Sequence, residues 1–202
     1  LVFIWYIKYG DYIMQTKLYR NLYELIHPSI SRKNITEYSI VLNDNVLPIK
    51  VFYPKIGVEL NRVILYLQDV KQTSEFYKKM AEELSSVVLL VENDNNDPSY
   101  IRTIEYIKEE LKKYLVTDNF SIIVEGHYCN VINSANLELP KTVYLNPINK
   151  LDLNYQSIII TNTKEIEGDS IFHYKGEFTH AMSEDGLAIR EKIFSTIRNL
   201  IK

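Results

Sequence analysis

The stretch FSIIVEGHYCN, residues 120–130, decides how the rest of the chain is interpreted. Its short run of apolar and β-branched residues is typical of a strand that is covered on both faces. The run leads to Gly126, and His127, Tyr128 and Cys129 follow directly. Glycine allows a sharp turn at little steric cost. The stretch therefore predicts a buried strand that turns abruptly into a short helix, with three chemically active side chains at the turn.

Apolar periodicity places further strands and helices on both sides of this stretch. Upstream, the turn residues 43–45 separate two strand-like runs, which predicts a hairpin. Farther upstream, apolar residues at helical spacing predict a helix over residues 18–26 that ends at His27-Pro28. The remaining strand-like runs alternate with helical stripes and cover residues 62–67, 86–92, 141–146, 157–161 and 171–176.

This order of elements predicts an α/β protein. We expect a three-layer α/β/α sandwich with a mostly parallel central sheet and an antiparallel N-terminal hairpin. In such sheets, ligands bind beyond the carboxyl ends of the strands. Functional residues are therefore expected just after five strand ends, namely Leu67, Val91, Glu125, Asn146 and Thr161.

Composition limits the classes of function. The 202 residues are 46% hydrophobic and 24% charged, as in a globular domain, and the net charge of −3 argues against a nucleic-acid binder. A single cysteine, Cys129, excludes an internal disulfide and a cysteine-rich zinc site. Asp94 and Asp97 lack the spacing of a calcium loop, and the dispersed glycines form no phosphate loop. We therefore expect no metal, no cofactor and no nucleic-acid partner.

Residues 1–13 differ from the rest of the chain. Their apolar run, LVFIWYI, is shorter than the roughly 20 residues that a membrane span needs. It also lacks the basic region and cleavage site of a signal peptide. We expect residues 1–13 to be a non-native or disordered extension, with Met14 as the initiator, and residues 14–202 to form a single domain. We also expect no membrane span and a cytoplasmic location.

The turn after the buried strand resembles the nucleophile elbow of the α/β-hydrolases. In that elbow a G-x-S-x-G pentapeptide joins a strand to a helix and holds the nucleophile in a strained conformation. Gly126 to Asn130 occupies this place, with Tyr128 where serine is expected and Asn130 in place of the second glycine. The order of elements from residue 36 to 202 is also similar to that of a compact, lid-less member of the superfamily.

The resemblance implies further site residues. In this family the catalytic acid follows the penultimate strand, which corresponds to Glu165, with Glu167 and Asp169 as neighbours that could serve instead. The catalytic histidine follows the last strand, and His180 stands there, before the closing helix. The implied relay is therefore His180 with Glu165.

Two departures from the family pattern argue against serine-hydrolase chemistry. A phenol at Tyr128 is a weaker acyl-transfer nucleophile, and its ring fills the space of the substrate. After Leu67 the family often has His-Gly, which supplies an oxyanion amide, whereas this chain has Gln68-Asp69. A carboxylate at Asp69 that points into the site repels an oxyanion. We expect Gln68, Asp69 and His127 to form a ligand-binding or oxyanion region.

These residues favour one function and leave another open. The favoured interpretation is an α/β-hydrolase-fold protein that has lost serine-hydrolase activity and binds a small molecule or protein partner, or acts structurally. The alternative is an active esterase or thioesterase-like hydrolase with Cys129 as the nucleophile and a His180/Glu165 relay. A flavodoxin-like domain is a third interpretation, which the opening hairpin and the placement of His180 disfavour.

Overall fold

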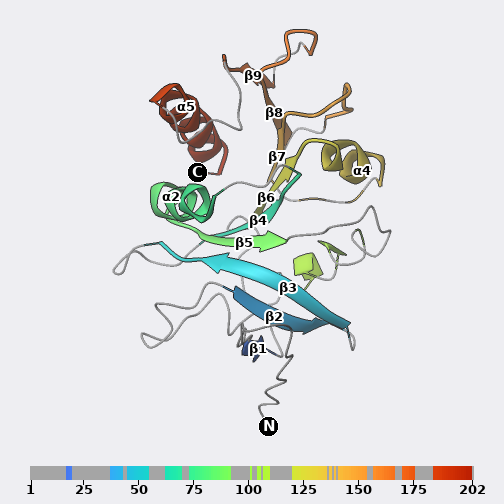
Figure 1. Cartoon of the computed structure of the whole chain (residues 1–202). Helices are drawn as coiled ribbons and strands as arrows, with labels where there is room; N and C mark the ends of the chain where they lie inside the picture. Colours follow the sequence, from blue (N-terminus) through green and yellow to red (C-terminus); the bar gives the residue numbers. More distant parts are fainter. Residues whose placement is uncertain are drawn as a thin grey trace, which may run out of the picture.

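The computed structural model describes most of the predicted domain (Figure 1). The described residues are 17–19, 37–42, 45–54, 62–69, 73–91, 101, 104–105, 107–109, 120–135, 137, 139, 141–153, 157–166, 170–175 and 184–201. The strands are β1 (Lys17–Tyr19), β2 (Glu37–Leu42), β3 (Asn45–Phe52), β4 (Val63–Leu67), β5 (Val87–Val91), β6 (Phe120–Glu125), β7 (Lys141–Leu145), β8 (Ser157–Thr161) and β9 (Ile171–His173). The helices with defined bounds are α2 (Ser74–Leu84), α4 (Tyr128–Ser134) and α5 (Glu184–Ile201).

Within the described residues, nine strands form one sheet in the order β1-β2-β3-β5-β4-β6-β7-β8-β9. β2 and β3 pair antiparallel from Leu42 opposite Asn45 to Glu37 opposite Lys50, which confirms the hairpin. β3 pairs antiparallel with β5, and all pairs from β5 to β9 are parallel. The predicted fold class, a mostly parallel sheet with an antiparallel N-terminal hairpin, is therefore confirmed.

Side chains cover the central strands on both faces of the sheet, as their continuous apolar runs predict. α2 and α5 lie on one face and α4 lies on the other (Figure 1). Along β4, alternate residues enter different clusters: Ile64 and Tyr66 pack on the α2 side, while Leu65 and Leu67 pack on the α4 side. This alternation follows from the two-residue period of a strand. The central strand ends are therefore held between two packed layers.

The predicted start of one helix is wrong, while residues 20–26 of that predicted helix lie outside the described residues. Leu18 lies in a three-residue strand, β1, which pairs parallel with β2, and not at the start of a helix. The hairpin leaves one side of β2 with unpaired backbone groups, and pairing with β1 satisfies some of them, which outweighs a weak helical preference. Residues 1–13, for which an extension was expected, lie outside the described residues.

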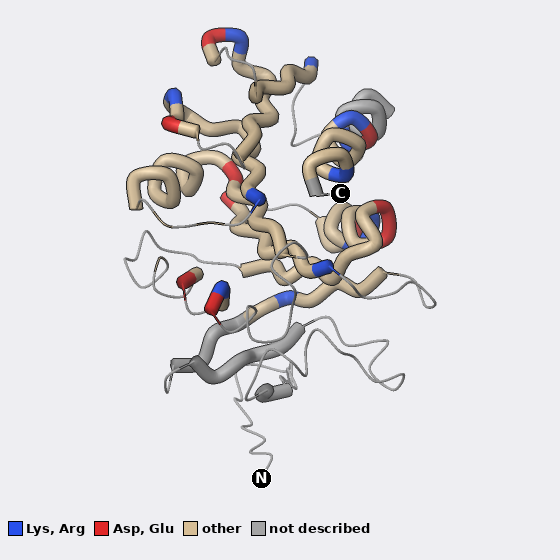
Figure 2. Tube along the Cα trace, turned by 180° about the vertical axis from the view of Figure 1, so that it is seen from behind, with Lys and Arg blue, Asp and Glu red and all other residues tan. Residues whose placement is uncertain are grey.

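Charged residues of both signs are interspersed along α2 and α5, whereas the central strands are almost free of charge (Figure 2). On α2, for example, Lys79 and Glu82 form an ion pair at 3.8 Å, and Glu83 lies beside Arg198 of α5 at 3.9 Å. Exposed pairs of this kind contribute little to stability. In the part of the chain that the structure describes, no helix is both long and apolar enough to cross a membrane.

Candidate functional site

The sharp turn after β6 is centred on Gly126. The Gly126 amide donates a hydrogen bond to the Leu145 carbonyl at 2.9 Å, and this bond continues the ladder between β6 and β7. At the next step the chain leaves the sheet: Gly126 has φ of +59°, in the left-handed region that favours glycine, and α4 begins at Tyr128. The chain therefore turns directly after Glu125, as the sequence predicts, and Tyr128, the expected nucleophile position, is the first residue of α4.

Asp69 fills the space beside Gly126. Asp69 follows the end of β4, which is the neighbour of β6 in the sheet. A side chain at position 126 would place its Cβ 1.8 Å from the Asp69 Oδ2 atom and 2.8 Å from the Asp69 Cβ. These distances are far below van der Waals contact. The carboxylate of Asp69 therefore occupies the volume into which a side chain at the turn would project.

His127 binds this carboxylate through two groups. The His127 amide donates to Asp69 Oδ2 at 3.0 Å, and the His127 Nδ1 atom lies 2.6 Å from Asp69 Oδ1. The second contact is an ion pair when the imidazole is protonated. Because the two bonds use both carboxylate oxygens, they fix the orientation of Asp69. The two side chains are 25% exposed for Asp69 and 35% exposed for His127, so solvent still reaches the pair.

Glu125, the last residue of β6, accepts hydrogen bonds from the end of β4. Its side chain is buried, and its Oε2 atom accepts the Asp69 amide at 3.2 Å and the Tyr66 hydroxyl at 3.4 Å. A buried carboxylate is costly unless hydrogen-bond donors surround it. The end of β4 supplies these donors. The backbone amides of Asp69 and His127 therefore both donate to side-chain carboxylates, the first to Glu125 and the second to Asp69.

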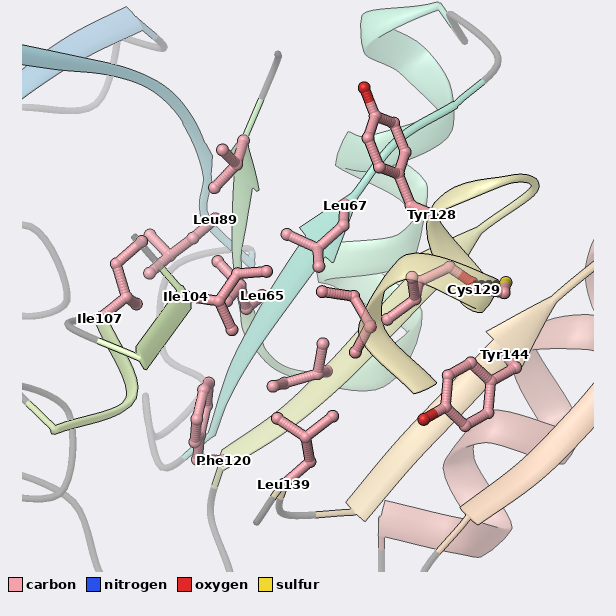
Figure 3. Close-up of a cluster of buried hydrophobic side chains, with 14 of the residues drawn as sticks. Leu65, Leu67, Leu89, Ile104, Ile107, Phe120, Tyr128, Cys129, Leu139 and Tyr144 are labelled. Atoms are coloured by element: carbon pink, nitrogen blue, oxygen red, sulfur yellow. Dashed lines mark hydrogen bonds between the residues drawn. The ribbon is translucent and has the colours of Figure 1, made fainter. Parts of the chain in front are cut away.

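Tyr128 and Cys129 are packed residues of α4 in the apolar cluster beneath the turn (Figure 3). The Tyr128 ring lies 3.9 Å from the His127 ring, and its hydroxyl points away from the apolar side chains of the cluster (Figure 3). The Cys129 thiol is fully buried and hydrogen-bonds the carbonyls of Val124 at 3.1 Å and Leu145 at 3.7 Å. Burial raises the pKa of the Cys129 thiol far above its usual range, with the Glu125 carboxylate adding to the shift. This environment keeps the sulfur protonated and shielded.

Buried tyrosines surround the same end of the sheet. Burial raises the pKa of Tyr66 well above 10.0, and the nearby Glu125 carboxylate adds to the shift. Tyr174, just after β9, donates its hydroxyl to Asn146 Oδ1 at 2.7 Å. Burial raises the pKa of Tyr174 to about 12, although its hydrogen bond with Asn146 acts in the opposite direction. Both phenols are therefore neutral donors at physiological pH.

The predicted site residues do not all meet at this turn. Asp69, His127, Tyr128 and Cys129 lie together, and Gln68 accepts a hydrogen bond from the Tyr77 hydroxyl at 2.5 Å. Glu165 lies exposed in the turn after β8. The alternatives for the acid, Glu167 and Asp169, and the predicted histidine, His180, lie outside the described residues, as do Asp94 and Asp97.

Sequence reasoning missed the roles of Glu125 and Tyr66. The available signal was a charged residue that ends an otherwise apolar buried strand, since such a residue needs a partner. Among the described residues, no three His, Cys, Asp or Glu side chains are grouped so that they could hold a metal ion. The chemistry of the turn is therefore that of hydrogen-bonded carboxylates, an imidazole and phenols.

Several solved structures have a similar fold. The Francisella virulence factor BioJ has a TM-score of 0.56 and 14% identity, and the match covers 82% of this chain and 85% of that one. An arylesterase has a TM-score of 0.57 and 10% identity, and the match covers 82% of this chain and 85% of that one. The lid-less α/β serine hydrolase XC6422 from Xanthomonas campestris has a TM-score of 0.54 and 12% identity, and the match covers 81% of this chain and 93% of that one. No protein-family model and no curated protein matches the chain.

Proposed function

Because the chain has the α/β-hydrolase fold, we propose that it is a member of that fold without serine-hydrolase activity, and that it acts in binding or in a structural role. The support comes from the turn after β6. We assign Gly126 to the nucleophile position, because it is the residue with positive φ between the strand and α4. Glycine carries no group that can attack a substrate.

The state of the two oxyanion amides carries the proposal. In this fold the oxyanion is bound by the amide after the nucleophile and by an amide from the loop after the third core strand. These positions correspond to His127 and to Asp69, which follows β4. Both amides donate to carboxylates, His127 to Asp69 and Asp69 to Glu125. To bind either amide, a developing oxyanion would have to displace one carboxylate, that of Asp69 or Glu125, while the other carboxylate lies close by and repels it.

Loss of these two donors would greatly slow acyl transfer. One oxyanion-hole donor is worth about 2.7 to 4 kcal/mol of transition-state stabilisation, so the loss of two donors lowers the rate by about ten-thousandfold or more. Neither alternative nucleophile compensates for the loss. Cys129 is buried and protonated, and Tyr128 is a helical residue packed against His127.

Active-site labelling tests the proposal. We expect no covalent labelling of the native protein by a fluorophosphonate probe, and no turnover of p-nitrophenyl acetate above that of the heat-denatured protein. We also expect no gain of turnover in Tyr128→Ser, because the new hydroxyl would project from α4 and not from the turn. Stoichiometric labelling, together with saturable ester turnover that the probe abolishes, would overturn the proposal.

The binding role is supported by the partial exposure of Asp69 and His127. Together they offer a carboxylate and an imidazole at the carboxyl end of the sheet, where ligands of this architecture bind. A thermal-shift comparison of wild type and His127→Ala against small amines, carboxylic acids and esters tests this role. A ligand that stabilises only the wild type supports binding at the turn, whereas equal shifts in both proteins would contradict it.

A further inference from the structure

Two hydrogen-bonded links join the ends of β4 and β6, one through the Asp69 carboxylate and one through the Glu125 carboxylate. From the end of β4, the Asp69 carboxylate accepts the amide and the imidazole of His127, which follows β6. From the end of β6, the Glu125 carboxylate accepts the amide of Asp69 and the hydroxyl of Tyr66, both at the end of β4. Each strand end therefore supplies a carboxylate that accepts hydrogen bonds from the other strand end.

The register of the sheet creates this exchange. β4 and β6 are parallel neighbours, with Leu67 opposite Val124. Glu125 is the residue after Val124, and Asp69 is the second residue after Leu67, so the two acidic residues leave the ladder side by side. Asp69 and Glu125 are 56 positions apart in sequence, and only the pairing of β4 with β6 brings them together.

The two links also position each other. The bond from the Asp69 amide to Glu125 fixes the backbone of Asp69, and that backbone directs the Asp69 carboxylate against Gly126. In turn, the bonds from His127 to Asp69 fix the chain directly after Glu125. Breaking either link therefore releases the backbone that holds the other link.

We infer that these two links form one interlock, which opens only as a unit and keeps both amides closed to ligands. The inference rests on the proposed function only in assigning these amides to the oxyanion site. The coupling between the links is a separate property, and ester turnover plays no part in its test.

Amide hydrogen exchange, measured residue by residue by NMR, tests the interlock with Asp69→Ala and Glu125→Leu. Asp69→Ala removes the acceptor of the His127 amide but leaves Glu125, the acceptor of the amide at position 69. Glu125→Leu, which has a similar side-chain volume, removes the acceptor of the Asp69 amide but leaves Asp69, the acceptor of the His127 amide. If the interlock is one unit, each variant speeds exchange at both amides. Coupling between contacting residues corresponds to about 2- to 150-fold in an equilibrium constant, and we expect acceleration in that range at the amide that keeps its acceptor.

Tyr174→Phe is the matched control, since it removes a buried hydrogen bond to Asn146 at the same end of the sheet. It should leave exchange at positions 69 and 127 unchanged. Acceleration confined to the amide that loses its own acceptor would overturn the inference, because the links would then open independently. If either variant fails to fold, Asp69→Asn and Glu125→Gln keep an oxygen acceptor but remove its charge, so each weakens one link, and the same crossed acceleration is expected at smaller magnitude.

Discussion

The turns after β6 and β7 have the same backbone design but different residues. At both turns a left-handed residue follows the strand: Gly126 with φ of +59° and Asn146 with φ of +51°. Both amides donate to a carbonyl of the next strand, Gly126 to Leu145 at 2.9 Å and Asn146 to Ile160 at 2.8 Å. The Asn146 side chain accepts a hydrogen bond from Tyr174, whereas position 126 has no side chain.

The difference shows that the turn geometry alone does not require glycine. Asparagine tolerates the left-handed region better than most residues, and it serves well after β7. After β6, the Asp69 carboxylate occupies the place of the Cβ atom. Glycine at 126 is therefore required by its neighbour as well as by its own backbone, and the two turns should respond very differently to the same substitution.

Gly126→Ala should have the largest effect. The new methyl group meets Asp69 and also leaves alanine at positive φ, so we expect a loss of about 2 to 6 kcal/mol in the free energy of unfolding. Urea denaturation measures this loss. Adding Asp69→Gly should recover part of the lost stability, because the carboxylate that obstructs the methyl group is gone. Unchanged stability in Gly126→Ala would show that Asp69 does not fill this space.

Asn146→Ala should have a smaller effect at the equivalent turn. Alanine there meets the left-handed penalty and removes the acceptor of the Tyr174 hydroxyl, for an expected loss of about 1.5 to 3 kcal/mol. Asn146→Gly is the control, since it removes only the acceptor and should lose less. A loss in Asn146→Ala as large as that in Gly126→Ala would contradict the distinction between the turns.

Tyr174→Phe should cost about 0.5 to 1.5 kcal/mol at neutral pH, where the hydrogen bond to Asn146 is intact. The pKa of Tyr174 is raised from 10.0 to about 12, so the folded state favours the neutral phenol. Its contribution to stability is therefore full below pH 10 and is lost as pH rises through about 12. Unfolding titrations from pH 8 to the alkaline limit should show a shallower decline in Tyr174→Phe than in wild type, and parallel curves would contradict this assignment.

The smallest expected effect concerns Cys129, which lies directly beneath the turn after β6. Because its thiol is buried and its pKa is raised, iodoacetamide should leave the folded protein unmodified at pH 8. In urea the same thiol should react rapidly, which provides the control. Fast alkylation of the folded protein would show that the turn opens and would revive Cys129 as a candidate nucleophile.

Much of the fold could be predicted from the sequence, because apolar runs and helical stripes depend on local spacing. The runs in β4, β5 and β6 and the hairpin of β2 with β3 were predicted in this way. β1 was not, because three residues carry too little periodicity to separate a strand from a helix, and pairing with β2 determines the outcome.

The site was predicted less completely. Asp69 was expected to disturb an oxyanion region, but its contact with Gly126 depends on the register between β4 and β6, which no local pattern specifies. The strand end at Glu125 was predicted, and the sequence placed the nucleophile position at Tyr128, whereas the proposed assignment to Gly126 depends on the backbone at the turn. The G-H-Y order suggested one alignment, while the hydrogen bond from Gly126 to Leu145 determines where the chain leaves the sheet.

Crowding at Gly126 also limits how this chain can evolve. Serine at position 126 would introduce a nucleophile only by colliding with Asp69, so that single step destabilises the protein before any activity can appear. Removing Asp69 first would break its bonds to His127 without supplying a nucleophile. Under the proposed assignment of the nucleophile position to Gly126, a serine nucleophile therefore requires at least two substitutions. The first of them brings no activity, so selection acting on single changes tends to preserve the present sequence.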